Sequence, residues 1–495
     1  MTRRALTQVL TLAVGSLAIA SCTARPLEIP LPRCESMSAL YLPQTLETKV
    51  DILFVIDNSG SMEQEQKNLA TQFPRLIEAL RHEQLGGRIP DVHIGVVTTD
   101  LGAGSYGLPS CEVSGGDGGA LQHKARIAGC TPPQDPWIAY DFTNDHTNIP
   151  GCQGDGVSCV KEAFSCIAQV GTQGCGFESP LEAARRALDP KRNTNPGFLR
   201  KDALLAVVFI TDEDDCSARN PQLFDPQQQS LSDPLGPLSS FRCFEFGIQC
   251  DVNDRNATGE RKHCTPAFDW LYKVDDYVSF FRSLKAPGDR VLMAAIAGPT
   301  SPVIVGKDGS KPTLAASCQS GSGFAVPALR IAHVVSAFDG TVDPICAPDF
   351  GPALRTIGAR IRNRLGAQCL TKPVLTDEGK GLCDGRDADG APCEVNNLQE
   401  ADCLVEEHAG GLDSLAIPVP RCPTELFDPA VTSCGATCPC WRVVRRPADR
   451  CGPKATPPST AFGVDILHAK EPETGTTVVA RCRVTIPACG AVMAL

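Results

Sequence analysis

The stretch KVDILFVIDNSGS, residues 49–61, decides the fold that we expect for this chain. Its first eight residues are almost continuously apolar, which is typical of a parallel strand covered on both faces. Asp57 follows directly, and Ser59 and Ser61 come two and four residues after it. A buried strand that ends in such a polar turn indicates an α/β sheet whose loops carry the functional groups.

Three later stretches have the same apolar character: DVHIGVVTT at 91–99, ALLAVVFI at 203–210 and RVLMAAIA at 290–297. Helices are expected after Ser61, at 180–188, and from about residue 349 to residue 366. Strands that alternate with helices predict an α/β fold, with a mostly parallel sheet and helices on both faces.

Two stretches are too long for ordinary connections, at about 101–175 and 216–285. They contain six and four cysteines and are rich in Gly, Pro, Asp and Asn, so we expect disulfide-rich insertions. From Cys369 onward helical periodicity disappears, and eleven cysteines lie among short β-like runs. Residues 369–495 are therefore predicted to form a small cysteine-rich β-type module.

The first residues of the chain predict export. Two arginines precede an apolar run, which the sequence IASC closes at Cys22; this order is typical of a signal peptide, here at 1–21. Cysteine after Ala-Ser resembles the lipobox of bacterial lipoproteins. The resemblance implies cleavage before Cys22, lipidation of that cysteine and an outer-membrane location, facing either the periplasm or the cell surface. The alternative is an ordinary signal peptide with Cys22 in a disulfide. Residues 22–48 are expected to be a tether.

Cysteine usage supports an oxidising compartment. Apart from Cys22, 24 of the 25 cysteines remain, and in an exported protein disulfides are favoured over zinc sites. Cys34 and Cys369 flank the α/β region, so we predict that they form a bridge. The twelve cysteines between 111 and 346, and the ten in the tail, would then pair among themselves.

The polar turn after the first strand predicts a metal site. Asp57, Ser59 and Ser61 place three oxygens in one turn, at the sheet edge where open α/β folds bind their ligands. Compact oxygen ligands suit Mg²⁺, Mn²⁺ or Ca²⁺. The formal net charge of −11 fits cation binding and argues against a nucleic-acid partner.

At this turn the sequence resembles the von Willebrand factor type A (VWA) family, over residues 49–368. In that family an Asp-x-Ser-x-Ser motif binds a divalent cation, together with a Thr from a second loop and an Asp from a third. This is the metal-ion-dependent adhesion site. Asp57, Ser59 and Ser61 match the first element, and Asp212, directly after the strand at 203–210, matches the third.

The second loop departs from the family. Glu178 stands where the family usually has Thr, with Ser179 and Thr172 as alternatives. The resemblance thus implies Glu178 as a further ligand; the other interpretation is a solvated acid at a helix start, where acids are favoured.

Four acids in a row, residues 212–215, follow the third strand. Asp212 is the expected ligand, and we predict that the other three are solvated charge. Cys216 is expected to hold this loop by a disulfide.

The resemblance implies a binding module that uses a divalent cation to bind an acidic side chain of a protein partner in adhesion or assembly. Mg²⁺ is the cation that we expect first, before Mn²⁺ or Ca²⁺. The alternative is a disulfide-stapled scaffold lipoprotein whose metal is inert. The sequence has no GxSxG, HExxH or Walker motif and no evident nucleophile–base pair, so we expect no enzymatic activity. Contact with the membrane is expected through the lipid anchor alone.

Overall fold

The computed structural model describes most of the chain between residues 35 and 485. The described residues are 35–43, 48–81, 85, 87–109, 111, 113–285, 290–309, 311–321, 323–366, 370, 372–387, 391–394, 396–409, 415–428, 431, 434–446, 460–470 and 476–485. The predicted signal peptide and Cys22 lie outside the described residues.

A seven-stranded sheet forms the centre of the α/β region, in the order β15-β10-β6-β2-β3-β4-β5. Its strands are β2 (Lys49–Ile56), β3 (Asp91–Thr98), β4 (Ile138–Asp141), β5 (His146–Thr147), β6 (Leu204–Ile210), β10 (Val291–Ala297) and β15 (Thr341–Pro344). The first five strands in this order, from β15 to β3, are parallel, whereas β4 and β5 add an antiparallel edge. All four strands predicted from the sequence are thus present.

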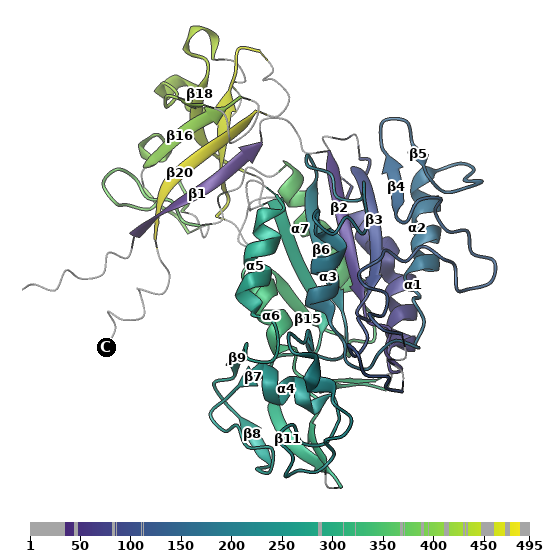
Figure 1. Cartoon of the computed structure of the whole chain (residues 1–495). Coiled ribbons are helices and arrows are strands. Elements are labelled where there is room, and N and C mark those ends of the chain that lie inside the picture. Colours follow the sequence, from purple (N-terminus) through teal and green to yellow (C-terminus); the bar gives the residue numbers. More distant parts are fainter. Residues whose placement is uncertain are drawn as a thin grey trace, which may run out of the picture.

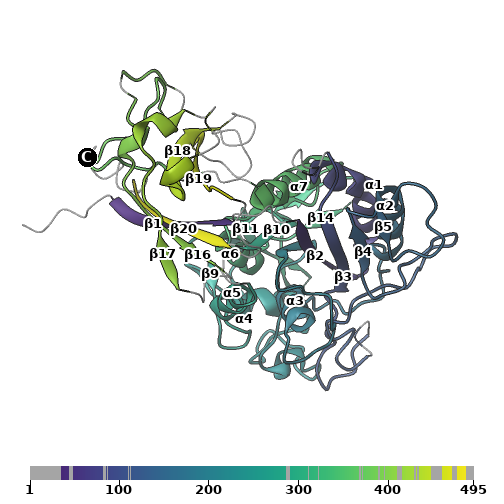
Figure 2. The same ribbon diagram turned by 90° about the horizontal axis from the view of Figure 1, so that it is seen from above.

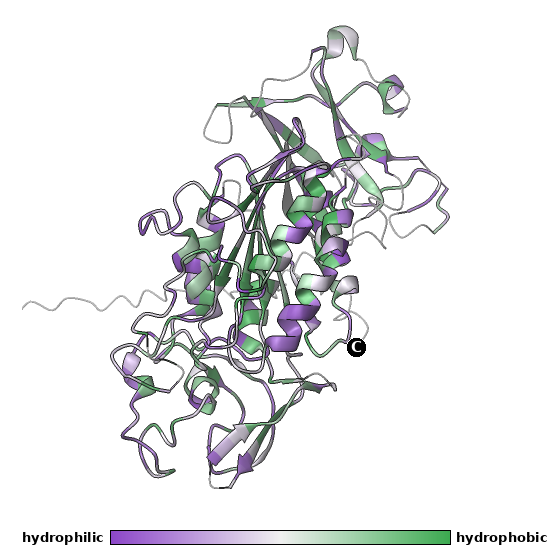
Figure 3. Cartoon of the chain, turned by 90° about the vertical axis from the view of Figure 1, so that its right-hand side faces the viewer, coloured by the Kyte–Doolittle hydropathy of each residue, from purple (hydrophilic) through white to green (hydrophobic). Residues whose placement is uncertain are grey.

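Helices cover both faces of this sheet (Figures 1 and 2). One face carries α1 (Glu63–Ala79), α2 (Gly156–Ile167) and α7 (Gly351–Gly366), whose apolar residues form one core with the sheet. The other face carries α3 (Pro180–Leu188), α5 (Val274–Ser283) and α6 (Leu329–Ser336), which form a second core. The centre of the sheet is buried because β2, β3, β6 and β10 are mostly apolar (Figure 3). The predicted fold class is confirmed.

The boundaries of the insertions differ from the prediction. The stretch 101–175 contributes β4 and α2 to the central fold, and 216–285 ends in α5, which packs on the sheet. A further excursion, after β10, was not predicted. The excursions contain the short elements α4 (Phe241–Gly247), β7 (Ile248–Gln249), β8 (Gly259–Arg261), β9 (Thr265–Pro266), β11 (Val303–Asp308), β12 (Lys311–Leu314), β13 (Cys318–Gln319) and β14 (Phe324–Ala325). The excursions after β6 and after β10 both begin at the carboxyl ends of strands. They lie at the bottom of the view in Figure 1.

A second β-sheet region lies at the opposite end of the central sheet (Figure 1). Its four-stranded sheet has the order β1-β20-β16-β17, and a separate pair is formed by β18 and β19. The strands are β1 (Glu35–Pro43), β16 (Cys403–His408), β17 (Ala416–Pro418), β18 (Cys440–Arg445), β19 (Phe462–Leu467) and β20 (Thr477–Thr485). The C-terminal part of the chain is therefore a β-type module, as expected.

The prediction of a tether at residues 22–48 is wrong for residues 35–43. These residues form β1, which pairs with β20 in antiparallel register from Glu35↔Thr485 to Pro43↔Thr477. The strand belongs to the C-terminal module although it precedes the α/β region in the sequence. Its partner lies more than 400 residues away, so no local pattern could reveal the pairing.

Disulfides cross-link both the α/β region and the C-terminal module. The twelve cysteines between 111 and 346 pair among themselves, as predicted: Cys111–Cys175, Cys130–Cys166, Cys152–Cys159, Cys216–Cys243, Cys250–Cys264 and Cys318–Cys346. The described part of the module adds Cys383–Cys393, Cys403–Cys482, Cys422–Cys440 and Cys434–Cys438. The predicted Cys34–Cys369 bridge lies outside the described residues.

Among the residues that the structure describes, no helix combines the length and the apolar character that crossing a membrane requires.

Candidate metal centre

Asp57 lies at the carboxyl end of β2 and is completely buried. Its backbone N–H donates to the carbonyl of Ile210 at 2.9 Å, which extends the pairing of β2 with β6 by one residue. Its Oδ1 accepts the N–H of Ser59 at 2.7 Å, and its Oδ2 accepts the hydroxyl of Thr211 at 2.8 Å. The carboxylate is therefore held in one orientation by groups that follow two neighbouring strands, β2 and β6.

The predicted ligands of the first and third loops lie together. The hydroxyls of Ser59 and Ser61 are 3.2 Å apart; Ser59 is buried and Ser61 is exposed. The side chains of Ser61 and Asp57 interact with the carboxyl group of Asp212 and oppose the rise of its pKa. Four residues that the sequence spreads over more than 150 positions thus meet at one sheet edge, which the solvent reaches on the side of Ser61.

The second loop lies beside this group. Glu178 is buried, and its carbonyl accepts the N–H of Cys216 at 2.7 Å. The hydroxyl of Ser179 donates to the Cys216 carbonyl at 3.4 Å, whereas no side-chain hydrogen bond is made by Thr172 in the described residues. No group of three or more His, Cys, Asp or Glu side chains among the described residues is arranged to hold a metal ion. The choice of Glu178 as a direct ligand therefore stays a prediction.

The prediction that residues 213–215 are solvated charge is wrong. Asp214 accepts the backbone N–H groups of Arg330 at 2.9 Å and of Ile331 at 3.2 Å, so it caps the start of α6. Asp215 is buried and pairs with the fully buried guanidinium of Arg330 at 3.1 Å. Glu213 is half-buried, and its carboxyl group interacts with the side chains of Glu178 and Ser240, which lower its pKa.

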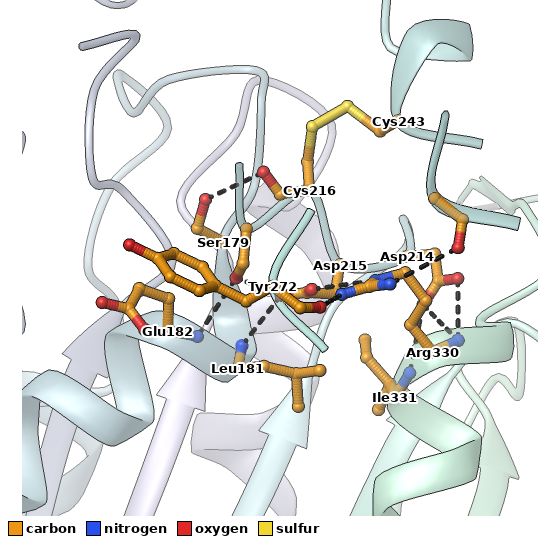
Figure 4. A network of polar contacts seen from close by, with 12 residues as sticks. Ser179, Leu181, Glu182, Asp214, Asp215, Cys216, Cys243, Tyr272, Arg330 and Ile331 are labelled. Carbon is orange, nitrogen blue, oxygen red and sulfur yellow. Dashed lines mark hydrogen bonds and ion pairs between the residues drawn. A yellow bond between two sulfur atoms is a disulfide. The ribbon is translucent and has the colours of Figure 1, made fainter. Parts of the chain in front are cut away.

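Figure 4 shows how Arg330 joins the loops around the site. Its partner Asp215 also accepts the N–H of Leu181, at the start of α3, at 3.1 Å. The guanidinium donates to the carbonyls of Tyr272 at 2.6 Å and of Ala267 at 2.9 Å, which belong to the excursion after β6. The disulfide Cys216–Cys243 holds the same loop to α4, so the predicted bridge at Cys216 is confirmed.

Buried carboxylates fall into two classes in this molecule. Three of the seven buried Asp and Glu side chains among the described residues have a cationic partner: Asp51 has Arg200 and Lys285, Glu182 has Arg185 and Arg186, and Asp215 has Arg330. The other four have no Lys or Arg partner in the described structure: Asp57, Glu65, Glu178 and Asp212. With Glu213 they form what we call the acid cluster.

The pKa values of the acid cluster are raised, as expected for buried carboxylates without a countercharge. Burial, together with repulsion from Asp212, raises the pKa of Asp57 to about 7. Burial and the carboxylates of Asp212 and Asp57 raise the pKa of Glu213 to about 8. Burial likewise raises the pKa values of Asp212, Glu178 and Glu65. Neighbouring carboxylates and burial both disfavour the charged form, and the attraction of a bound cation would oppose both effects.

Two atoms of the acid cluster are buried without a hydrogen-bond partner in the described structure, namely Oδ1 of Asp212 and Oε2 of Glu65. Glu65 was missed in the sequence. It lies on α1, eight residues after Asp57, and the charge of Asp212 contributes to its raised pKa. Its position on the buried face of an otherwise amphipathic helix was the one available signal, because a buried acid needs a partner.

No protein-family model matches the chain, and no curated protein is similar to it. Three solved structures illustrate what the fold is similar to. A von Willebrand factor type A protein from Catenulispora acidiphila is 11% identical with a TM-score of 0.29, over 91% of this chain and 61% of that one. The pilus adhesin SpaC from Lactobacillus rhamnosus GG is 10% identical with a TM-score of 0.31, over 91% and 41%. The conserved hypothetical protein BatB from Bacteroides thetaiotaomicron is 11% identical with a TM-score of 0.25, over 64% and 98%.

This chain resembles VWA proteins in its motif and in its fold. It spans 61% and 41% of the first two structures. At these identities and scores the likenesses carry no argument about ligands or partners. The resemblance rests on the Asp-x-Ser-x-Ser turn after β2, on Asp212 after β6, and on the parallel sheet between two helix layers.

Proposed function

We propose that this chain is an envelope-anchored VWA binding module, which holds a divalent cation at a metal-ion-dependent adhesion site and binds a protein partner through it. One observation carries the proposal. Among seven buried carboxylates, the four without a Lys or Arg partner gather around the Asp-x-Ser-x-Ser turn, with Oδ1 of Asp212 buried and unpaired.

The residues present fit a hard divalent cation. Asp57 and Asp212 would supply carboxylate oxygens, and Ser59 and Ser61 would supply hydroxyl oxygens, which are the ligands that Mg²⁺, Mn²⁺ and Ca²⁺ prefer. The cation would supply the countercharge that the acid cluster lacks. Glu178 would add a third carboxylate, as a ligand or as a nearby charge.

The chemistry of the partner follows from the exposure of the site. Ser61 is exposed while Asp57 and Asp212 are buried, so a bound ion would face solvent on one side. A carboxylate from a protein partner is the group that a hard cation takes most readily at an open position. The site is proposed to bind an acidic side chain in adhesion or envelope assembly, and no catalytic role is assigned to it.

The proposed envelope location depends on the N-terminal residues. Signal cleavage before Cys22 and acylation of that cysteine would anchor the protein to the outer membrane. The measurement is membrane fractionation: Cys22→Ser would shift the protein from the membrane fraction to the soluble fraction.

The metal site is tested by thermal unfolding of the full chain, after stripping with chelator, in Mg²⁺, Mn²⁺ or Ca²⁺. A cation that binds only the folded state stabilises it by about 2.7 kcal/mol at a hundredfold excess over its dissociation constant. The midpoint should rise with cation concentration in wild type and stay constant in Asp57→Ala and Asp212→Ala.

Asp214→Ala is the matched control. It belongs to the same acidic run, but its carboxylate caps α6, so the variant should lose about 1 kcal/mol of stability and keep its response to the cation. A wild type that does not respond after stripping would refute the metal site.

A scaffold with a purely structural metal is the second candidate function, favoured by the ten disulfides in the described residues. The two functions differ in the role of the ion. A partner that is captured equally well in chelator and in cation would support the scaffold and contradict the adhesion site.

A further inference from the structure

Thr99 lies beside Asp57, one residue beyond the end of β3. The parallel register pairs Ile56 with Thr98, so Asp57 and Thr99 occupy the next pair of positions at the same sheet edge. Side chains in register on neighbouring strands project from the same face. Thr99 and Asp57 are therefore expected to project to the same side of the sheet.

The side chain of Thr99 is completely buried, and its Oγ1 has no hydrogen-bond partner among the described residues. The preceding residue behaves differently, because the hydroxyl of Thr98 donates to Oδ2 of Asp117 at 2.6 Å. A buried hydroxyl without a partner is unfavourable. The hydroxyl of Thr99 is thus available to bind a group from outside the polypeptide.

The backbone of Thr99 connects the end of β3 to the second loop of the site. Its carbonyl accepts the N–H of Ser179 at 2.9 Å, directly after Glu178. The hydroxyl of Ser179 is directed to the Cys216 carbonyl. The hydroxyl of Thr99, in contrast, has no partner in the described structure.

We propose that Thr99 supplies the hydroxyl ligand that the second loop lacks, from the end of β3. This inference rests on the proposed function, since it assumes that the site binds a divalent cation. A hydroxyl ligand is neutral, so with Thr99 bound the ion needs no third carboxylate beside Asp57 and Asp212. The ion then keeps more of its attraction for an acidic partner than it would with Glu178 bound.

The test compares three variants of the full chain in two measurements. Mn²⁺ binding to the stripped protein is measured by titration calorimetry, and the unfolding midpoint is measured in chelator. Thr99→Val replaces the hydroxyl by a methyl group of similar shape. Thr99→Ser keeps the hydroxyl, and Thr98→Val removes a hydroxyl that already has a partner.

Thr99→Val should weaken Mn²⁺ binding by about tenfold or more, while its midpoint in chelator is equal to that of wild type or higher. Thr99→Ser should bind Mn²⁺ like wild type. Thr98→Val should show the opposite pattern, with a lower midpoint in chelator and unchanged binding. A merely structural role of Thr99 would lower the midpoint without changing the affinity. If Thr99→Val does not fold, Thr99→Ala provides the same comparison.

The outcomes separate this inference from the proposed function. Unchanged Mn²⁺ affinity in Thr99→Val, with binding in wild type, overturns the role of Thr99 and leaves the site. Absence of Mn²⁺ binding in wild type overturns both.

Discussion

Asp212 and Asp215 show how much two acids three residues apart can differ. Asp212 has an unpaired buried oxygen and carboxylates around it, whereas Asp215 has the guanidinium of Arg330. The spacing of Asp57, Ser59 and Ser61 and the position of Asp212 after a strand were readable from the sequence. The pairing of Arg330 with Asp215 could not be predicted, because the two residues lie 115 positions apart. One sequence does not show which distant residue neutralises a buried charge.

Neutralising these two acids should have opposite effects on the protein in chelator. Asp212→Asn relieves repulsion within the acid cluster, so the metal-free form should gain about 1 kcal/mol. Asp215→Asn leaves the buried Arg330 without its partner and should cost about 3–5 kcal/mol. Unfolding midpoints in chelator measure both. Equal destabilisation by both variants would contradict the view that the cluster lacks a countercharge.

At the scale of elements, the long apolar strands were predictable and the short edge was not. β2, β3, β6 and β10 are mostly apolar runs because both of their faces are covered. β4 has four residues with alternating burial, and β5 has two. Such short strands are defined by their neighbours in the sheet, not by a pattern of their own.

Helix α3 begins at the second loop, and its buried Glu182 forms ion pairs with Arg185 and Arg186. Glu182 accepts hydrogen bonds from Arg185 at 2.7 Å and from Arg186 at 2.8 Å. Burial raises the pKa of Glu182, but the hydrogen bonds from these arginines outweigh burial and lower it below 4.5. A pKa that is lower in the folded state stabilises the protein above the unfolded value, and this contribution is lost as the pH falls through the folded pKa.

Glu182→Gln should therefore be less stable than wild type by about 2 kcal/mol at pH 7. The difference should shrink as the pH falls below 4.5, the ordinary pKa of glutamate. Unfolding midpoints over this pH range test the prediction. Glu63→Gln is the control, since its ion pair with Lys67 is exposed and should contribute little. A constant difference between wild type and Glu182→Gln at every pH would contradict the assignment.

At the scale of the whole molecule, the chain begins and ends its described part in one sheet. β1 and β20 pair along nine residues, so the module is completed by residues from both sides of the α/β region. The sequence indicated two regions but assigned the first strand to a tether. This pairing joins residues from the two ends of the described chain, so no local sequence pattern predicts it.

The candidate metal centre and the module lie at opposite ends of the central sheet (Figure 1). A cation should therefore order the loops at the carboxyl edge and leave the module unchanged. Hydrogen exchange of the full chain in Mn²⁺ and in chelator measures this region by region. We expect slower exchange with Mn²⁺ at residues 57–66 and 211–216, and equal exchange in β16 and β20. Asp212→Ala should remove the difference at the first two segments. If Mn²⁺ also slowed exchange in β16 and β20, the two regions would be energetically coupled, and the module would belong to the binding mechanism.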